Sequence, residues 1–422
     1  MITRIEIDGF KSFLDFELDV RPCTVLVGGN GSGKSNLLEA LDLVRRTVRS
    51  GFPATPGADT PHAPLPLFHH AETGGRGHTA TVISIKVGMI VPSADGPLPV
   101  VVWLEIERES GAPRSLGAAP LLRGSVWVSS LERTGWMRRQ GIPEELSAAM
   151  TEARERFLRR TGTDWVSLDD AEHPAGAGDG ELLALLHREC ETWQPLALDP
   201  AAMRRPSAGS ELEPLQADGA NLAAVLHRLG HTERHPLEED LTALLPETSG
   251  IRPLFDERRG EYDFDVRLGH TGWASPALLS GGTLRTLALL AAWRDERRAG
   301  VLAVEEPENG LHPTTLVGLV GRLRRGIDGY ADMAERATRV RGFRQLLVAT
   351  QSPALLSALR HETAGNLVFL EQTPHTDHKH QVESMVTRAH PLREQRPGED
   401  PGETLSAEQI TRMLDGMQRL TV

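Results

Sequence analysis

The sequence predicts an α/β protein built on a largely parallel β-sheet, and two observations carry that prediction. In the last third of the chain, short apolar runs alternate with helical patterns, an order typical of parallel strands covered by helices. These segments read VLAVEE, TTLVGLVGRLRRG, RQLLVAT, PALLSALR and NLVFLE. Near the N-terminus, a glycine-rich turn stands between a continuous apolar run, CTVLV, and a helical pattern, NLLEALDLV. Both features are expected where a sheet presents a binding edge.

The remaining elements follow in chain order. The segments ITRIEI and FLDFELDV alternate apolar and polar residues and predict strands, and TATVISIKVGMIV, LPVVVWLEIERE and GSVWVSS predict further strands. Residues 50–70 are rich in Pro, Gly and Ala and predict a long loop. From about Pro143 to Leu229 helix formers with charged faces dominate, which indicates a helical insertion. The expected organisation is a first α/β part (1–140), a helical insertion (141–235), a second α/β part (236–390), and a polar tail with a terminal helix (391–422).

Composition narrows the class of protein. At 422 residues the chain has room for two or three domains, and 39% hydrophobic with 25% charged residues is ordinary for a soluble protein. Two cysteines are too few for a disulfide framework. There is no apolar run long enough for a bilayer and no signal-peptide pattern, so we expect a cytoplasmic protein without a membrane partner. A net charge of −12 argues against an overall basic surface but leaves a local DNA-binding groove open.

The glycine-rich turn is the strongest functional signal. Gly28–Ser35 reads GGNGSGKS and fits G-x-x-x-x-G-K-[ST], with the strand and helix that this motif requires. Its amides are expected to cradle the phosphates of ATP, Lys34 to reach the β- and γ-phosphates, and Ser35 to offer its hydroxyl to Mg²⁺. The expected nucleotide-binding residues are Gly28, Asn30, Gly31, Ser32, Gly33, Lys34, Ser35 and Asn36.

Two adjacent carboxylates form the second signal. Glu305 and Glu306 end the apolar run VLAVEE, where a parallel strand delivers side chains to the ligand-binding edge. By position, Glu305 is the expected magnesium ligand, together with Ser35, and Glu306 the expected general base for the attacking water. A solvated strand end is the alternative when these residues are considered alone.

A second possible anion site lies at LLSGGTLR. Ser280 stands at a helix N-cap position, and Gly281 and Gly282 leave the first amides accessible. Leu284, Leu287, Ala288 and Ala291 follow at helical spacing, so we expect one face of this helix to be buried. Alone, the Ser-Gly-Gly sequence is a common helix cap.

Taken in order, these segments resemble the ABC-type ATPases of the RecF/SMC/OLD-like branch, a group of predicted AAA-family ATPases. The similarity includes ITRIEIDGFKSF, GGNGSGKSNLLEAL, DGANLAAVL, LSGGTLR, LAVEEPENGLHP and LLVATQSPALL. It covers both ends of the chain but not the helical middle. The resemblance implies a P-loop NTPase fold of the ABC type, with a mixed sheet beside the mostly parallel core sheet. It also implies ATP and Mg²⁺ as ligands.

The resemblance further implies a homodimer, or a larger assembly, that encloses two ATP molecules between two heads. Ser280, Gly281 and Gly282 would then contact the γ-phosphate bound by the partner, and residues 309–311 would couple the two sites. In this branch the switch residue, Gln351 here, is expected to assist catalysis beside Glu306. The resemblance suggests a role in DNA maintenance or antiviral defence with a separately encoded effector or nuclease. OLD-type relatives carry a TOPRIM nuclease domain, and we expect none here, because too few residues follow RQLLVAT, the strand that precedes Gln351.

Three departures from the family pattern shape the expected activity. Glu305 replaces the usual Asp, and Gln351 replaces a frequent His and cannot carry a proton, so we expect slow turnover. The glutamine of the family's Q-loop has no clear match, and the loop with His69, His70 and Glu72 occupies the region where it could lie. The alternative is therefore an ATP-locked scaffold that recruits a partner without hydrolysis. A transporter subunit is disfavoured, because the N-terminal strands resemble the RecF/SMC branch.

A histidine-rich segment, PHTDHKH, contains His375, His378 and His380. Imidazoles at this density can bind a metal ion. The polar surroundings favour a solvated loop instead.

Overall fold

The computed structural model describes residues 1–50, 67–107, 121–128, 142–162, 164–167, 177–208, 213–269, 271–298, 300–330, 333, 343–359 and 364–393. Most of the predicted loop at 50–70 and most of the predicted tail at 391–422 lie outside the described residues.

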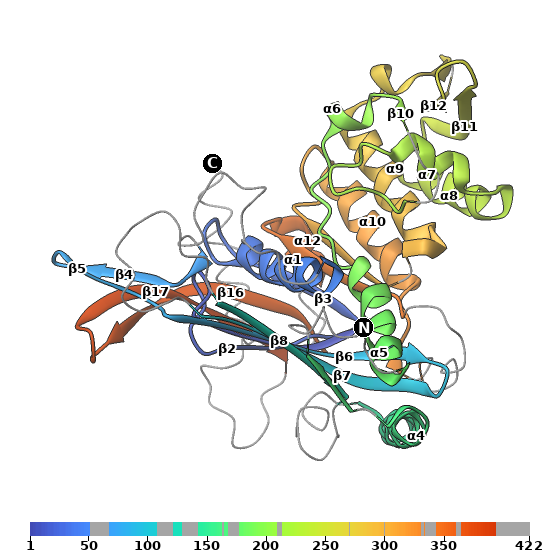
Figure 1. Ribbon diagram of the computed structural model, residues 1–422. Helices are drawn as coiled ribbons and strands as arrows, with labels where there is room; N and C mark the ends of the chain where they lie inside the picture. Colours follow the sequence, from blue (N-terminus) through green and yellow to red (C-terminus); the bar gives the residue numbers. More distant parts are fainter. Residues whose placement is uncertain are drawn as a thin grey trace.

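The predicted parallel sheet forms the centre of the molecule (Figure 1). It has five strands in the order β14-β15-β3-β16-β17. Their bounds are β14 (Val301–Glu305), β15 (Gln345–Thr350), β3 (Cys23–Val27), β16 (Ala364–Asp377) and β17 (Val382–Arg393). The first four run parallel, and β17 returns antiparallel to β16. The carboxyl ends of β14, β15 and β3 therefore meet at one edge of the sheet, as the sequence predicts.

Both faces of this sheet are buried, which explains the continuous apolar runs in its strands. Alternate side chains enter two different cores. In β14, Leu302 and Val304 pack into a core shared with the helices on one face. Val301 and Ala303 pack into a core on the other face, which includes helix α1 (Lys34–Ser50) and the N-terminal strands.

A second, antiparallel sheet has six strands in the order β2-β1-β6-β7-β8-β9. The strands are β1 (Ile2–Asp8), β2 (Phe16–Asp19), β6 (Val82–Ser93), β7 (Gly96–Glu107), β8 (Leu121–Val128) and β9 (Trp165–Ser167). Helix α4 (Glu144–Thr161) packs on β7, and α5 (Ala177–Glu191) packs on α1. With the central sheet this gives the mixed α/β architecture that was expected.

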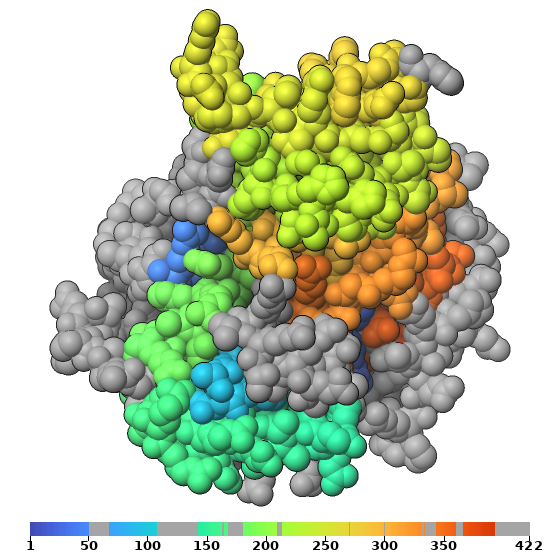
Figure 2. Space-filling view, turned by 90° about the vertical axis from the view of Figure 1, so that its right-hand side faces the viewer, coloured from blue at the N-terminus to red at the C-terminus, as the bar shows by residue number. Residues whose placement is uncertain are grey.

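The third part gathers most of the other helices around a small antiparallel sheet (Figure 1). Its strands are β10 (Ser207–Ala208), β11 (Thr248–Asp256), β12 (Glu261–Leu268) and β13 (Gly272–Ala274). Its helices are α6 (Pro200–Met203), α7 (Leu222–Arg228), α8 (His231–Leu244), α9 (Gly281–Arg294) and α10 (Pro313–Arg325), with short 3₁₀ turns η2 (Pro276–Leu278) and η3 (Glu296–Arg298). Helix α12 (Pro353–Leu359) packs on α10. Figure 2 shows β11 and β12 (yellow) at one end of the molecule and α4 (green) at the other.

A separate hairpin, β4 (His70–Thr73) and β5 (Arg76–Thr79), packs against β17. Among the helices in the described part of the chain, none has the length and apolar character that crossing a bilayer requires.

The structure corrects three details of the sequence prediction. Helix α9 was expected to bury one face, but nearly every side from Gly282 to Trp293 is buried, because the helix lies in the middle of a core. The beginning of the predicted polar tail is part of β17, which continues to Arg393. The histidine-rich segment is the end of β16 and the turn after it rather than a loop, because β17 pairs along its length.

Candidate nucleotide-binding site

Three segments meet at the carboxyl edge of the central sheet. The glycine-rich turn Gly28–Ser35 follows β3, the carboxylates Glu305 and Glu306 end β14, and Gln351 follows β15. Because these strands are parallel neighbours in the order β14-β15-β3, the sheet brings all three segments to one place.

The backbone of the turn requires glycine at several positions. Gly31 and Gly33 have φ values of +79° and +102°, which residues with a side chain rarely adopt. At Gly28, a Cβ atom would lie 2.4 Å from the carbonyl oxygen of Leu370. The turn is therefore packed closely from below, while a Cβ at Gly29 or Gly31 would meet no atom within 4 Å. One side of this loop remains approachable by a ligand.

Lys34 lies over the turn and is buried. Its Nζ donates to the carbonyl oxygens of Gly28 (2.7 Å) and Gly29 (2.9 Å). Burial lowers the pKa of Lys34, and the carboxylates of Glu306, Glu308 and Glu305 act in the opposite direction. The ammonium group thus lies among the negative charges at the end of β14.

The two expected magnesium ligands are in direct contact. The hydroxyl of Ser35, in the first turn of α1, donates to Oε1 of Glu305 at the end of β14. A hydroxyl and a carboxylate are hard oxygen donors, and Mg²⁺ is usually held by one or two carboxylates together with substrate phosphates. The donor set therefore fits Mg²⁺, and the longer side chain of Glu305 reaches Ser35.

Glu306 is held in an unusual backbone conformation. Its φ is +44°, a region that is costly for a residue with a side chain and that recurs at functional sites. Its carboxylate accepts a hydrogen bond from Nδ2 of Asn309 (3.0 Å) and one from Nε2 of Gln351 (3.3 Å). The amide of Glu306 also donates to Ala349 in β15, which fixes the turn after β14.

Glu308 is a residue that the sequence reasoning missed. Its carboxylate accepts a hydrogen bond from the backbone amide of Gln351 (2.8 Å) and one from the hydroxyl of Thr350 (2.8 Å). It thereby connects the segment after β14 to the segment after β15 and positions Gln351. The PENG sequence alone gives no sign of these partners, which lie 42 and 43 residues away.

A second missed feature supports the glycine-rich turn from β17. The hydroxyl of Thr387 lies 2.8 Å from the hydroxyl of Ser12 and 3.1 Å from the carbonyl oxygen of Ser32. Asn36 donates to the same Ser12 hydroxyl (2.9 Å). A Cβ at Gly33 would lie 2.3 Å from the Thr387 hydroxyl, so a side chain at Gly33 is excluded. We call Ser12 and Thr387 the loop brace.

The segment LSGGTLR (residues 279–285), which we call the signature segment, begins α9 in another part of the chain. The hydroxyl of Ser280 accepts from the amide of Thr283 (3.0 Å), so Ser280 caps the helix as predicted. A Cβ at Gly282 would lie 2.4 Å from the carbonyl oxygen of Gly310. Arg285 donates to the carbonyl oxygen of Asn309 (2.7 Å). The start of α9 therefore contacts residues 309–311, the segment expected to couple two sites.

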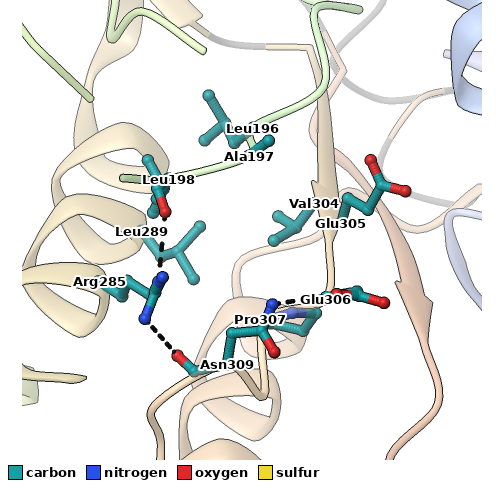
Figure 3. A pocket seen from close by; sticks show the side chains of 10 residues that line it. All are labelled: Leu196, Ala197, Leu198, Arg285, Leu289, Val304, Glu305, Glu306, Pro307 and Asn309. Atoms are coloured by element: carbon teal, nitrogen blue, oxygen red, sulfur yellow. Dashed lines mark hydrogen bonds between the residues drawn. The ribbon is translucent and has the colours of Figure 1, made fainter. Parts of the chain in front are cut away.

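A cavity of about 250 Å³ lies between α9 and the end of β14 (Figure 3). Glu305, Glu306 and Asn309 line one side of it and Arg285 another. The segment Leu196–Leu198 forms a further wall and continues the sheet, because Leu196 bridges to Val304 in parallel. Arg285 donates to the carbonyl oxygen of Leu198 (3.3 Å), and so spans the cavity from α9.

The structure brings Lys34, Ser35, Glu305, Glu306 and Gln351 to one edge, whereas Ser280 makes its hydrogen bonds within its own helix turn. The loop considered for the Q-loop lies elsewhere. His69 contacts the carbonyl oxygen of Lys11 and the hydroxyl of Ser384 in β17, and His70 and Glu72 are on the exposed hairpin β4–β5. The segment that bridges to β14 at this edge is Leu196–Leu198, and not the loop with His69.

Comparison with known proteins agrees with this geometry. Residues 173–357 match a family model described as "AAA domain, putative AbiEii toxin, Type IV TA system". Residues 1–55 match a second model, described as an AAA ATPase domain. Both matched models are domains of the AAA ATPase group, which supports the ATPase resemblance inferred from the motifs.

One solved structure supports the same overall fold, and two further Smc heads give weaker matches. The Smc head domain of Pyrococcus yayanosii, with a coiled coil and joint, is 12% identical, with 99% of each chain covered and a TM-score of 0.50. The Smc head of Pyrococcus furiosus bound to the C-terminal domain of ScpA is 14% identical (99% of each chain, TM-score 0.47). The SMC head domain of Thermotoga maritima is 13% identical (93% and 99%, TM-score 0.44). A search of curated protein sequences found no match.

Proposed function

We propose that this ATPase domain binds ATP and Mg²⁺ at the Gly28–Ser35 turn, hydrolyses the ATP slowly, and uses the nucleotide to control head-to-head dimerisation. The observation that carries the proposal is the contact between Ser35 and Glu305. It joins the turn that would bind phosphates to the strand that ends in Glu306, the proposed base.

The residues at the sheet edge divide the work of phosphoryl transfer. The amides of the glycine-rich turn and Lys34 would bind the phosphates, which would replace the carbonyl oxygens of Gly28 and Gly29 as partners of the Lys34 ammonium. Ser35 and Glu305 would hold Mg²⁺. When bound, this ion neutralises charge on the β- and γ-phosphates.

Glu306 would orient the attacking water and take its proton. Its carboxylate is fixed by Asn309 and Gln351, which donate to different oxygens of it. A general base must be held within hydrogen-bond reach of the proton that it accepts. Gln351 would contact the water or the γ-phosphate as a neutral hydrogen-bond partner, which supports slow turnover.

Dimerisation would use the signature segment of each chain. Ser280 is exposed at the N-terminus of α9, the end of a helix that favours an anion. The segment after β14 contacts Gly282 and Arg285, so changes at the hydrolysis site could reach the signature through residues 309–311. Ser280→Arg should abolish ATP-dependent dimerisation in light scattering while ATP binding to the monomer persists. Dimerisation that is unchanged in this variant would contradict the head-to-head arrangement.

We further propose a cytoplasmic role with a separately encoded effector or nuclease, in antiviral defence or DNA maintenance. The description of the matched family as a type IV toxin–antitoxin ATPase domain supports the first setting. The likeness to Smc heads supports the second only as far as the fold. Electrophoretic mobility shift with duplex DNA, with and without ATP, tests whether DNA is a direct partner.

The alternative is a scaffold that stays locked with ATP. The observation that favours it is the engagement of Gln351 with Glu306, in a site whose switch residue cannot carry a proton. The two functions differ in phosphate release: a switch releases phosphate continuously, whereas a scaffold binds ATP tightly and releases none.

Loss of nucleotide binding tests the site itself. Lys34→Ala removes the cation nearest the turn and should reduce the binding of a fluorescent ATP analogue at least tenfold. Binding at wild-type affinity in this variant would refute the assignment of Gly28–Ser35.

A further inference from the structure

A cluster of metal-binding side chains lies apart from the nucleotide site, at the ends of two hairpins. His78 is on β5, Asp377 ends β16, and His380 lies in the turn before β17. One ligand atom from each of these residues lies within 4.8 Å of the others. The three side chains are half-buried rather than fully exposed. We call them the hairpin cluster.

The hydrogen bonds of Asp377 fix the turn that carries His380. Its Oδ1 accepts from the amides of Lys379 (2.9 Å) and His380 (3.1 Å), and its Oδ2 lies 2.6 Å from Nδ1 of His380. Oδ1 holds the turn, so Oδ2 is the oxygen that could bind a metal ion, and that bond would replace the contact with Nδ1 of His380.

His78 is brought to this turn by contacts that do not involve the histidines. The amide of Glu383 donates to the hydroxyl of Thr73 (2.8 Å), and Arg76 donates to the side chain of Gln381. These bonds hold the hairpin β4–β5 against the hairpin β16–β17. Contacts between the two hairpins, and not only the histidine side chains themselves, therefore keep His78 close to His380.

The two imidazole rings lie face to face. Their centroids are 3.6 Å apart and the planes differ by 8°. A metal ion binds an imidazole through an unprotonated ring nitrogen, and the stack brings two such rings to one place.

We propose that the hairpin cluster binds one divalent transition-metal ion of the Zn²⁺ type and that this ion clasps the two hairpins together. Two imidazoles and a carboxylate suit Zn²⁺, and are a poor set for Mg²⁺ or Ca²⁺, which prefer oxygen ligands. In a tetrahedral site with bonds of about 2.0–2.1 Å, ligand atoms are roughly 3.3 Å apart. Rotation of the half-buried rings out of their stack supplies the remaining movement, and water completes the coordination.

The clasp has a stabilising role because of its position. The hairpin β16–β17 also carries Thr387 of the loop brace, which lies in β17, after His380 of the cluster. An ion bound only by the folded chain stabilises that fold by mass action. Zn²⁺ is therefore expected to raise the thermal midpoint, and this does not require that the nucleotide site work as proposed.

Calorimetric titration of the tag-free full chain with Zn²⁺, in excess Mg²⁺, tests the proposal. Wild-type protein should bind one Zn²⁺ per chain, and the double variant His78→Ala/His380→Ala should bind at least tenfold more weakly. His378→Ala is the matched control, because this exposed histidine lies in the same turn but outside the cluster, and it should bind as the wild type. Far-ultraviolet circular dichroism and ATP binding verify that each variant is folded.

Three results would overturn the proposal. They are the absence of saturable Zn²⁺ binding to the wild type, binding that persists in the double variant, and an equal loss in His378→Ala. Displacement of the ion by Mg²⁺ would equally contradict the assigned metal class. Replacement of Zn²⁺ by Co²⁺ should give the strong visible absorption of a tetrahedral site, and its absence would contradict the proposed geometry.

Discussion

The loop brace offers a test of how the glycine-rich turn is held, through the substitution Thr387→Val. Valine has nearly the same shape as threonine but lacks the hydroxyl, so the change isolates the hydrogen bonds of Thr387. This side chain is fully buried, and its hydroxyl serves both Ser12 and the carbonyl oxygen of Ser32. Leaving a buried polar group without its partner costs about 1–3 kcal/mol, and we expect the free energy of unfolding to fall by that amount.

The same substitution should weaken ATP binding, because the bond from Thr387 fixes the carbonyl of a residue within the phosphate-binding turn. If the substitution destabilises the ATP-bound protein by about 0.4–1.4 kcal/mol more than the free protein, the dissociation constant for ATP rises roughly twofold to tenfold. The assay is a fluorescent ATP titration together with urea unfolding. Thr387→Ser is the control: it keeps the hydroxyl and loses a methyl group packed near Gly33, so it should lose stability but retain ATP affinity.

The reasoning would be refuted by either of two results. One is a Thr387→Val protein that binds ATP and unfolds as the wild type does. The other is a Thr387→Ser protein that loses as much ATP affinity as the valine variant, because the methyl group would then be the feature that matters.

Two further substitutions test contacts that the sequence did not reveal. Glu308→Ala removes the acceptor that positions Gln351, so the rate of ATP hydrolysis in single-turnover assays should fall about tenfold with little change in ATP affinity. Glu308→Gln keeps one oxygen and should lose less. A hydrolysis rate in Glu308→Ala equal to that of the wild type would contradict this role. Gly282→Ala places a methyl group 2.4 Å from the carbonyl oxygen of Gly310 and should destabilise the protein by about 1–3 kcal/mol in thermal unfolding. In Gly281→Ala the nearest contact of the new methyl group is a proline side chain at 3.2 Å, so this variant should lose less stability. A larger loss in Gly281→Ala than in Gly282→Ala would contradict the described packing.

The central sheet could be predicted because its strands are buried on both faces. Such strands are continuous apolar runs, and the glycine-rich turn and the carboxylate pair mark where β3 and β14 end. The helical character of α9 was also clear, but its complete burial was not recognised. The run TLALLAAW is apolar on all sides, which is the pattern of a helix inside a core rather than at a surface.

The missing parts of the prediction depend on contacts between distant residues. Glu308 finds its partners 42 and 43 residues away and Thr387 finds Ser32 355 residues away, and neither pairing leaves a local pattern. The segment NLVFLE at the start of β16 was predicted as a strand, but the outer part of the hairpin β16–β17 was missed. That part is polar and partly exposed, so it resembles a loop in composition. Only the pairing of the two strands brings His380 next to His78.

The most direct test of the proposed function is phosphate release from the purified full chain with saturating ATP and Mg²⁺, compared between wild type and Glu306→Gln. Glutamine preserves the shape and one oxygen of the side chain but cannot accept the proton of the attacking water. The account predicts slow, continuous release by the wild type and a loss of at least 100-fold in the variant, roughly the contribution of a general base, with ATP binding retained. Release that is equal in both proteins would contradict the assignment of Glu306, and the absence of release from the wild type despite tight ATP binding would favour the locked scaffold.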